Sequence, residues 1–259
     1  MQLKDKTIIV TGSAGGIGRA IALACVQEGA QVLLVDRNEV GLRETNEILG
    51  QRSSVYVDDL LDTASATRIV KAAVDRFGVL HGIVNNAALL TRSNIETTTP
   101  ELLARVFKVN ARAPMLLIQA GLKYLTESKG SVLNIGSVNA YCGEPPLLAY
   151  SMSKGALMTM TRNLGDSLHA EYGIRVNQIN PGWVLTDHEF EIKVADGLPE
   201  NWPSRIPRDI APSGGLVPPE TIAAAAVYWL SDNSRPISGT VMDLEQYPVI
   251  GRNPVKEVV

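Results

Sequence analysis

A phenol and an ammonium group lie four residues apart in the segment Tyr150-Ser151-Met152-Ser153-Lys154. On a helix, positions i and i+4 share one face, so Tyr150 and Lys154 are expected to point into the same cleft. An ammonium ~5 Å from a phenol favours the phenolate by roughly 3 kcal/mol at an effective dielectric constant of about 20, which puts the phenol pKa about two units below its reference value near 10. Tyr150 is thus a candidate acid/base near neutral pH, and Ser137 upstream could hold a substrate oxygen in line with it.

A glycine-rich segment follows the first apolar run of the chain. Residues 7–11 predict a buried strand, residues 12–18 (Gly-Ser-Ala-Gly-Gly-Ile-Gly) follow directly, and an apolar helical pattern then runs from Ile17 to Glu28. Glycines remove the Cβ atoms that would keep a pyrophosphate away from main-chain N–H groups and the positive end of the helix. The pattern predicts a dinucleotide site, although a tight strand-to-helix connection would use the same glycines.

A second apolar run, residues 31–35, ends at Asp36. An acid at this strand end can accept hydrogen bonds from the ribose hydroxyls of an adenosine and would repel a 2′-phosphate, which favours NAD over NADP. Two alternatives stay open. Asp36 could only cap the helix that begins near Glu39, and the neighbouring Arg37 could tolerate a phosphate.

Taken together, these residues resemble the short-chain dehydrogenase/reductase family over most of the chain. Residues 11–18 look like its cofactor turn, and residues 85–88 (Asn-Asn-Ala-Ala) are similar to its Asn-Asn-Ala-Gly segment. Residues 181–186 look like its Pro-Gly segment, whose Thr faces the nicotinamide carboxamide. The sequence departs from the family at Ala88 and at residues 245–247 (Glu-Gln-Tyr), where many members carry Asp-Gly-Gly. The second departure concerns the packing of the C-terminal segment rather than the chemistry.

The resemblance implies a catalytic set of Asn110, Ser137, Tyr150 and Lys154, which follow the order of the family tetrad. Tyr150 would exchange a proton with the substrate alcohol while a hydride passes to or from the nicotinamide. Lys154 would bind the nicotinamide ribose and lower the pKa of Tyr150. Asn110 would help hold a water that links Lys154 to solvent, whereas without the resemblance it would be interpreted as a helix-interior Asn bonded to the main chain.

The cofactor-binding residues follow from the same motifs. Asp59 is expected at the adenine amine, as part of a segment similar to the family's, although Asp58 could replace it because the end of the third strand is fixed only to within a residue. Asn86 is expected on the adenosine side of the cleft. The expected NAD contacts are Gly12, Ser13, Gly16, Ile17, Gly18, Asp36, Asp59, Leu60, Asn86, Ala87, Tyr150, Lys154, Pro181, Gly182, Val184 and Thr186.

Strand and helix patterns alternate along the whole chain, and no linker interrupts them. This predicts one domain over residues 1–259, a Rossmann-type α/β fold with a doubly wound parallel sheet of seven strands and helices on both faces. The strands are expected at 7–11, 31–35, 54–57, 80–84, 131–136, 174–179 and 240–244. The helices are expected at 17–29, 39–49, 62–77, 99–127, 150–172 and 219–231.

The long connection from about residue 183 to residue 218 is expected to cover the substrate, because such connections are usually lids or binding loops. Its Trp183, Trp202 and His188 would suit a polyhydroxy substrate such as a sugar or polyol. Alternatively, each Trp only docks the lid, and His188 is a solvated loop residue. The expected substrate contacts are Ser137, Asn139, Glu144, Tyr150, Trp183 and His188.

The composition of the chain argues against several kinds of partner and cofactor. The net charge is −3 and the basic residues are scattered, so neither nucleic acid nor a membrane surface is an expected partner. No apolar run reaches the ~18 residues of a membrane span, and residues 1–6 lead straight into the first strand, so we expect a cytoplasmic protein. The three histidines lie far apart without carboxylates at ligand spacing, and no metal is expected. The family resemblance, together with the apolar content of the helices at 99–127 and 150–172, implies a homotetramer.

Three functions compete at this stage. The leading one is an NAD-dependent dehydrogenase of an alcohol, sugar or polyol. A second is a carbonyl reductase of the 3-oxoacyl-carrier-protein type, which Asp36 and the acidic residues of the lid disfavour. The third is a nucleotide-sensing module without activity, which would not need all four residues of the catalytic set.

Overall fold

The computed structural model describes residues 1–250 and contains one parallel sheet of seven strands, in the order β3-β2-β1-β4-β5-β6-β7. The strands are β1 (Thr7–Thr11), β2 (Gln31–Asp36), β3 (Ser53–Val57), β4 (Gly82–Asn85), β5 (Ser131–Ile135), β6 (Arg175–Pro181) and β7 (Val241–Leu244). Every residue of β1 and β5 is buried, as strands covered on both faces require. The order reverses between β1 and β4, and sheets of this kind bind ligands at the carboxyl ends beside such a point. The predicted fold class is confirmed.

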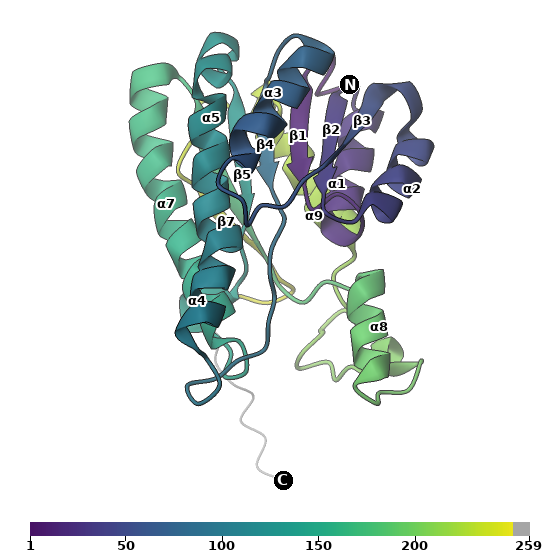
Figure 1. Ribbon diagram of the computed structural model, residues 1–259. Helices are drawn as coiled ribbons and strands as arrows, with labels where there is room; N and C mark the ends of the chain where they lie inside the picture. Colours follow the sequence, from purple (N-terminus) through teal and green to yellow (C-terminus); the bar gives the residue numbers. More distant parts are fainter. Residues whose placement is uncertain (251–259) are drawn as a thin grey trace.

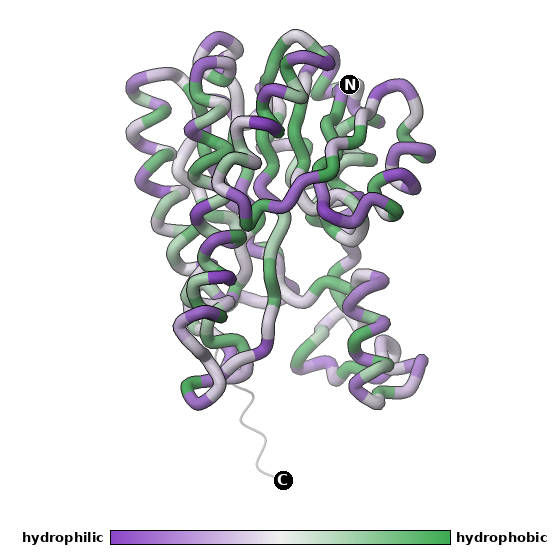
Figure 2. The backbone as a smooth tube through the Cα atoms, in the orientation of Figure 1, coloured by the Kyte–Doolittle hydropathy of each residue, from purple (hydrophilic) through white to green (hydrophobic). Residues whose placement is uncertain are grey.

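Helices cover both faces of this sheet (Figure 1). The long helices are α1 (Gly16–Gln27), α2 (Glu39–Leu49), α3 (Ser65–Phe77), α5 (Ala113–Ser128), α7 (Leu148–Tyr172) and α9 (Pro219–Leu230). One apolar core lies between the sheet and α1, α2 and α9, and a second lies between the other face and α3, α5 and α7. Figure 2 shows the central strands mainly apolar and the helices alternating between apolar and polar positions. No helix within residues 1–250 is both long and apolar enough to cross a membrane.

The helix expected at 99–127 is divided into three parts. Thr99 caps its start by accepting a hydrogen bond from the main-chain N–H of Leu102, and α4 (Pro100–Phe107) follows. A π-helical turn, Lys108–Arg112, then leads into α5. Such turns leave the normal hydrogen-bond pattern of the helix and are frequent at functional sites. The sequence pattern does not predict this turn, because apolar positions continue through it.

The lid segment, residues 183–218, is more structured than expected. It contains α8 (Asp187–Ala195) and a short 3-10 helix, Trp202–Arg205. Figure 1 shows α8 apart from the two helical layers, beyond the end of the sheet where the strands finish. A bridge between Val184 and Val217 joins the start of the segment to its end. The remaining short helices, α6 (Asn139–Cys142), η1 (Gly50–Arg52) and η4 (Asp232–Ser234), lie in connections between longer elements.

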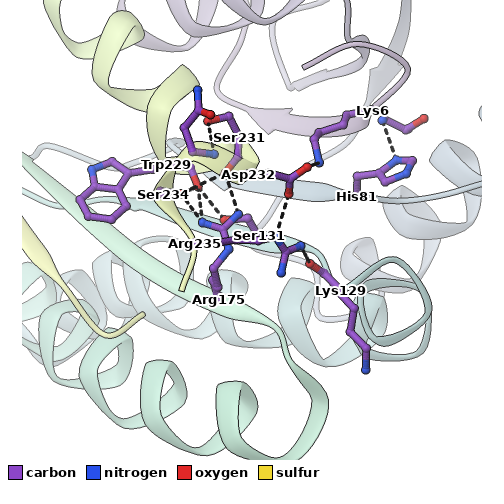
Figure 3. A network of polar contacts seen from close by, with 12 residues as sticks. Lys6, His81, Lys129, Ser131, Arg175, Trp229, Ser231, Asp232, Ser234 and Arg235 are labelled. Carbon is purple, nitrogen blue, oxygen red and sulfur yellow. Dashed lines mark hydrogen bonds and ion pairs between the residues drawn. The ribbon is translucent and has the colours of Figure 1, made fainter. Parts of the chain in front are cut away.

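A polar network closes the opposite end of the sheet (Figure 3). Arg175 is 1 % exposed and donates hydrogen bonds to the main-chain carbonyls of Trp229 and Ser231, at the end of α9. Burial lowers the pKa of Arg175 to about 10. Nearby, Asp232 pairs with Lys6 at 3.1 Å and with Arg235 at 2.8 Å. These contacts fasten α9 and η4 to the amino ends of the strands, so the carboxyl ends are left for a ligand.

Candidate active site

Three of the expected catalytic side chains meet beyond the carboxyl end of β5. Ser137 lies two residues after β5, and its hydroxyl hydrogen-bonds to the phenol of Tyr150. Tyr150 and Lys154 lie one turn apart on α7, and Lys154 Nζ is 5.5 Å from the centre of the Tyr150 ring. Lys154 Nζ also donates to the Ile135 carbonyl at 2.7 Å, which ties the helix to the strand. The i, i+4 spacing thus places both groups in one site, as the sequence predicts.

Burial opposes the low pKa that we expected for Tyr150. The residue is 8 % exposed, and loss of hydration raises its pKa to about 12, while the hydrogen bond from Ser137 acts in the opposite direction. Lys154 is 2 % exposed, and burial lowers its pKa to about 7. The spacing in the sequence shows the attraction between the two groups, but the loss of hydration of each group depends on the folded structure. The buried pair therefore favours the neutral phenol in the protein without cofactor.

Asn110 lies in the π-helical turn and is 1 % exposed. Its Nδ2 donates to the Leu89 carbonyl at 3.0 Å and to Ser153 Oγ at 2.9 Å, and its Oδ1 accepts from the Leu89 N–H at 2.7 Å. The side chain therefore ties the segment after β4 to α7, and its hydrogen bonds go to these residues rather than to Lys154. This matches the alternative in which Asn110 bonds the main chain. A role in holding a water stays a prediction.

The glycine turn between β1 and α1 forms a cradle. Gly12 has φ +69°, and a Cβ there would lie 2.7 Å from Asn86 Nδ2. A Cβ at Gly18 would overlap with the Gly12 carbonyl oxygen. Asn86 Nδ2 donates to the carbonyls of Thr11 and Gly12, so Asn86 braces the turn from behind. Together with the N-terminus of α1, this geometry fits the pyrophosphate of a dinucleotide.

Two other members of the expected cofactor set face the protein rather than the cradle opening. Ser13 is fully buried, and its hydroxyl donates to the Val35 carbonyl. Ile17 packs against the core that lies below α1. Thr186 approaches the glycine turn from the lid, since its Cγ2 would lie 3.3 Å from a Cβ at Gly16. The Thr186 hydroxyl accepts a hydrogen bond from the Glu189 N–H and so caps the start of α8. The cradle is thus closed by the segment that begins the lid.

A pocket beside the cradle is suited to the adenosine half of the cofactor. Asp36 lies in its wall, where its carboxylate accepts hydrogen bonds from the N–H groups of Ala14 and Asn38. Asp58 is paired with Arg68 at 2.7 Å, whereas Asp59 accepts only from the Leu61 N–H among the contacts described, so the geometry favours Asp59 for a ligand. The pocket is lined by Gly12, Val35, Asp36, Arg37, Asp58, Asp59, Leu60, Leu61, Ala87, Ala88, Leu89 and Val109.

Comparisons with known proteins agree with this geometry. A family model described as enoyl-(acyl carrier protein) reductase matches residues 12–245. An NADP-dependent (R)-specific alcohol dehydrogenase of Lentilactobacillus kefiri is 32% identical over 92% of this chain and 94% of its own. A sorbitol dehydrogenase of Cereibacter sphaeroides is 33% identical over 88% of this chain and 91% of its own. A solved structure of a 3-ketoacyl-(acyl-carrier-protein) reductase from Brucella melitensis with NADH superposes with a TM-score of 0.82, at 28% identity over 93% and 97% of the two chains.

The chain belongs to the short-chain dehydrogenase/reductase family. It is an oxidoreductase, and its relatives are named as dehydrogenases of alcohol groups. In residues 1–250 no group of His, Cys, Asp and Glu side chains is arranged to hold a metal ion.

The departure of this short-chain dehydrogenase/reductase from the family motif after β7 has a structural counterpart. Glu245 Oε2 accepts from the Trp183 N–H at 3.2 Å and lies where a Cβ of Gly182 would be. Gln246 Oε1 accepts from the Ser213 N–H, and its Nε2 donates to the Gly215 carbonyl at 2.7 Å. These two side chains thus fasten both ends of the lid. Sequence reasoning missed them, because their partners lie about 30 and 60 residues away along the chain.

The expected substrate residues are only partly brought together. Asn139 Nδ2 donates to Glu144 Oε2 at 3.4 Å beside Ser137. Trp183 stacks on Trp202 with ring centres 5.8 Å apart, and its Nε1 donates to Glu189 at 2.8 Å. Trp202 is 4 % exposed, so it belongs to the interior of the lid. Trp202 therefore packs inside the lid, as the alternative predicts, while contact of the half-buried Trp183 with substrate stays a prediction.

His188 is exposed near the start of α8 and makes no hydrogen bond or ion pair among those described for residues 1–250. The structure thus gives no contact that directs it toward Ser137 or Tyr150. Its proposed contact with substrate rests on the sequence position alone. Arg92, in the segment after β4, pairs with Asp196 at the end of α8 at 3.1 Å and so connects the lid to the other side of the site.

Proposed function

We propose that this protein is an NAD-dependent dehydrogenase that interconverts a secondary alcohol, such as a sugar, a polyol or a related hydroxy compound, with its ketone or lactone. The observation that carries the proposal is the hydrogen-bonded pair of Ser137 and Tyr150 with Lys154 beside it, at the same end of the sheet as a cradle that fits a dinucleotide. The sorbitol dehydrogenase relative supports the choice of substrate class.

The chain would contribute positioning and proton transfer. Ser137 would hold the substrate oxygen, and Tyr150 would take the alcohol proton in oxidation or return it in reduction. Lys154 would bind the ribose hydroxyls and keep a positive charge near the phenol. The nicotinamide, when bound, accepts or donates the hydride. Val184, Pro181 and Gly182 would border the nicotinamide, because they precede Thr186 at the start of the lid.

Cofactor choice follows from Asp36. Its carboxylate lies in the wall of the adenosine pocket, where it would accept ribose hydroxyl bonds and repel a 2′-phosphate. Arg37 lines the same pocket and is exposed, so it is the residue that could favour NADP instead. The NADH complex of the Brucella melitensis structure supports NAD, while the Lentilactobacillus kefiri relative is described as NADP-dependent.

A second candidate is reduction of a 3-oxoacyl group on a carrier protein. It is favoured by the description of the matching family model and of the Brucella melitensis structure. It is opposed by the exposed carboxylates Asp187, Glu191 and Glu200 on the lid, because acyl carrier proteins are acidic.

The test is a screen of reduced-cofactor absorbance with NAD and NADP against sugars, polyols, hydroxy acids and 3-oxoacyl thioesters. We expect turnover of a hydroxy compound with NAD, and a loss of about 10²–10⁴-fold in the Tyr150→Phe variant with little change in NAD affinity. Activity only on 3-oxoacyl thioesters would favour the second candidate. NAD binding without turnover of any compound would favour a sensing module.

The proposal also includes a homotetramer in the cytoplasm. α5 and α7 carry the exposed Met115 and Met152, which suit burial against other copies of the chain. Light scattering at micromolar concentration would give about four times the chain mass of 27.9 kDa, and a monomer would contradict the proposal.

A further inference from the structure

A chain of buried side-chain hydrogen bonds crosses the sheet on the face covered by α7. Asn85 of β4 donates to Asn134 of β5, Asn134 donates to Thr161 of α7, and each distance is 2.8 Å. The Thr161 hydroxyl lies 2.8 Å from Gln178 Oε1 on β6 and 2.9 Å from the Leu157 carbonyl, and its single proton is shared between these two acceptors. Gln178 donates to Asn180 at 2.7 Å. All five side chains are at most 3 % exposed. Polar groups at this depth are costly unless they are paired, and among the amide and hydroxyl atoms of these five side chains only Asn85 Oδ1 has no partner in residues 1–250.

This series of hydrogen bonds ends at the main chain of Ser137, just after β5. Asn180 Oδ1 accepts a hydrogen bond from the main-chain N–H of Ser137 at 3.1 Å, and Asn180 Nδ2 donates to Asp243 Oδ1 on β7 at 3.0 Å. A Cβ at Gly136 would overlap with the Asn180 amide oxygen, so glycine at this position allows the approach. The Tyr141 hydroxyl also bonds to Asn180 and Asp243.

The amide of Asn180 can point in only one direction. The N–H of Ser137 and the Nε2 of Gln178 are donors, so both require the oxygen of Asn180. The carboxylate of Asp243 accepts, so it requires the nitrogen. These three partners therefore fix the orientation of the amide that holds the main chain at Ser137.

The same series of hydrogen bonds also includes α7, the helix that carries Tyr150 and Lys154. Thr161 follows Lys154 by seven residues, two turns further along the face of α7 that carries Tyr150. Thr161 thus links this face to β6, while Asn180 links β6 to Ser137. The separation between the Ser137 hydroxyl and the Tyr150 phenol is set across these contacts.

We propose that Asn180 is a positioning residue, which holds the main chain at Ser137 so that the Ser137 hydroxyl meets both Tyr150 and the substrate oxygen. The inference rests on the proposed function, since it assigns a role in that reaction. Asn180 acts only through Ser137. The Ser137 hydrogen bond lowers the pKa of Tyr150, and Lys154 is the other titratable group beside that phenol. Displacement of Ser137 should therefore raise the pKa of Tyr150 and shift the pH profile of oxidation to higher pH.

The first experiment is a double-mutant cycle of Asn180→Ala with Ser137→Ala, measured on the substrate found in the screen. Asn180→Ala should lower kcat by roughly 10–100-fold, leave the Kd of NAD unchanged and shift the pH profile upward. In the Ser137→Ala background it should cause no further loss of kcat. If the two losses multiply, Asn180 does not act through Ser137 and the proposal is overturned.

Asn177→Ala is the matched control. Asn177 is also a buried Asn of β6, with hydrogen bonds to the Ile237 carbonyl and the Thr240 N–H, but it does not contact Ser137. It should lower the Tm as Asn180→Ala does, without moving the pH profile. An equal shift of the pH profile in this control would mean that both variants only loosen the strand, which contradicts the proposal.

A rescue variant covers the case in which Asn180→Ala does not fold. Asn180→Asp alone places a second carboxylate against Asp243 and should impair turnover. Adding Asp243→Asn restores a donor at that position and keeps an acceptor for the Ser137 N–H, so turnover and pH profile should return toward the wild-type values. A double variant no better than Asn180→Asp would overturn the role assigned to the amide.

A measurement without substrate separates this inference from the proposed function. Hydrogen exchange of the Ser137 amide should be slow in the wild type and faster by roughly 10-fold in Asn180→Ala, because the amide loses its hydrogen-bond acceptor. Unchanged exchange contradicts the inference even if the enzyme is an active dehydrogenase. Faster exchange in a protein that turns over no alcohol contradicts the proposed function alone.

Discussion

At the scale of single residues, the site depends on two buried groups whose hydration has been lost. Burial raises the pKa of Tyr150 to about 12 and lowers that of Lys154 to about 7. In the proposed mechanism, oxidation requires the phenolate of Tyr150, the form that burial disfavours, whereas reduction requires the phenol. The sign of the pH dependence follows directly. Oxidation should become faster as pH rises above neutrality, and reduction should become slower.

Lys154→Met tests the contribution of the charge. The proposed role requires Lys154 to be protonated in the complex with NAD, although burial lowers its pKa to about 7 in the protein alone. The variant keeps a long apolar stem but removes this ammonium 5.5 Å from the Tyr150 ring, so the rise of oxidation with pH should move to higher pH. It should also weaken NAD binding, because Lys154 is proposed to bind the ribose, whereas Tyr150→Phe should not. Profiles of kcat/KM from about pH 6 to about pH 10, together with NAD titrations, measure both effects. An unchanged pH profile in the variant would contradict the assigned role.

Asp36→Ala tests the cofactor choice. Its carboxylate lies in the adenosine pocket beside Arg37, which the variant retains. Loss of charged hydrogen bonds should raise the Kd of NAD by roughly 10–100-fold, and removal of the repulsion should lower the Kd of NADP. Fluorescence titration with both cofactors measures the ratio. Similar affinities for the two cofactors in the wild type would already contradict the prediction.

At the scale of elements, the lid is a small aromatic unit fastened to the end of β7. Phe190 and Trp183 both stack on Trp202, and Glu245 and Gln246 hold the main chain at both ends of the segment. Because the aromatic side chains pack together and both ends of the segment are held, we expect α8 to move as one body if the lid opens. Substrate access should therefore depend on hydrogen bonds that are distant from Tyr150.

Gln246→Ala removes the two hydrogen bonds to the main chain at Ser213 and Gly215. We expect faster hydrogen exchange in residues 213–217 and a higher KM for substrate, with kcat changed less and global stability lowered by about 1–2 kcal/mol. Gln2→Ala is the control, because Gln2 makes a comparable surface bond with Asn233 far from the lid. Equal exchange rates in the wild type and Gln246→Ala would show that this side chain does not hold the lid.

At the scale of the whole molecule, the two ends of the sheet have different roles. The carboxyl ends carry the site, and the amino ends are closed by the network of Arg175, Asp232 and Lys6 (Figure 3). His81 belongs to this end, where its Nδ1 accepts a hydrogen bond from the Thr7 N–H at 2.9 Å. Burial, and next the charge of Lys6, lower the pKa of His81 from its ordinary value of 6.5.

Acid should therefore destabilise the protein through His81. The neutral imidazole is favoured in the folded state, so stability is complete above the unfolded pKa of 6.5 and is lost as pH falls from there through the lower folded pKa. Urea unfolding at a series of pH values should show this loss, and His81→Gln should show less of it. His188→Gln, at an exposed position, is the control and should behave as the wild type. A loss of the same size in His81→Gln would assign the acid sensitivity to other groups.

The sequence by itself determined the features that depend on local spacing. The i, i+4 relation of Tyr150 and Lys154, the glycines of the cradle and the position of Asp36 at a strand end all follow from helix and strand geometry within a short stretch of chain. The family motifs extend this to a parallel sheet of seven strands with helices on both faces.

Tertiary structure alone decided what depends on contacts between distant residues. Asn180 meets Ser137 across 43 positions of the chain, and Glu245 meets Trp183 across 62. The burial of Trp202, which makes it part of the lid rather than a substrate platform, follows from packing of the same kind. The raised pKa of Tyr150 belongs here too, because desolvation depends on every group that surrounds the phenol and not on its sequence neighbours.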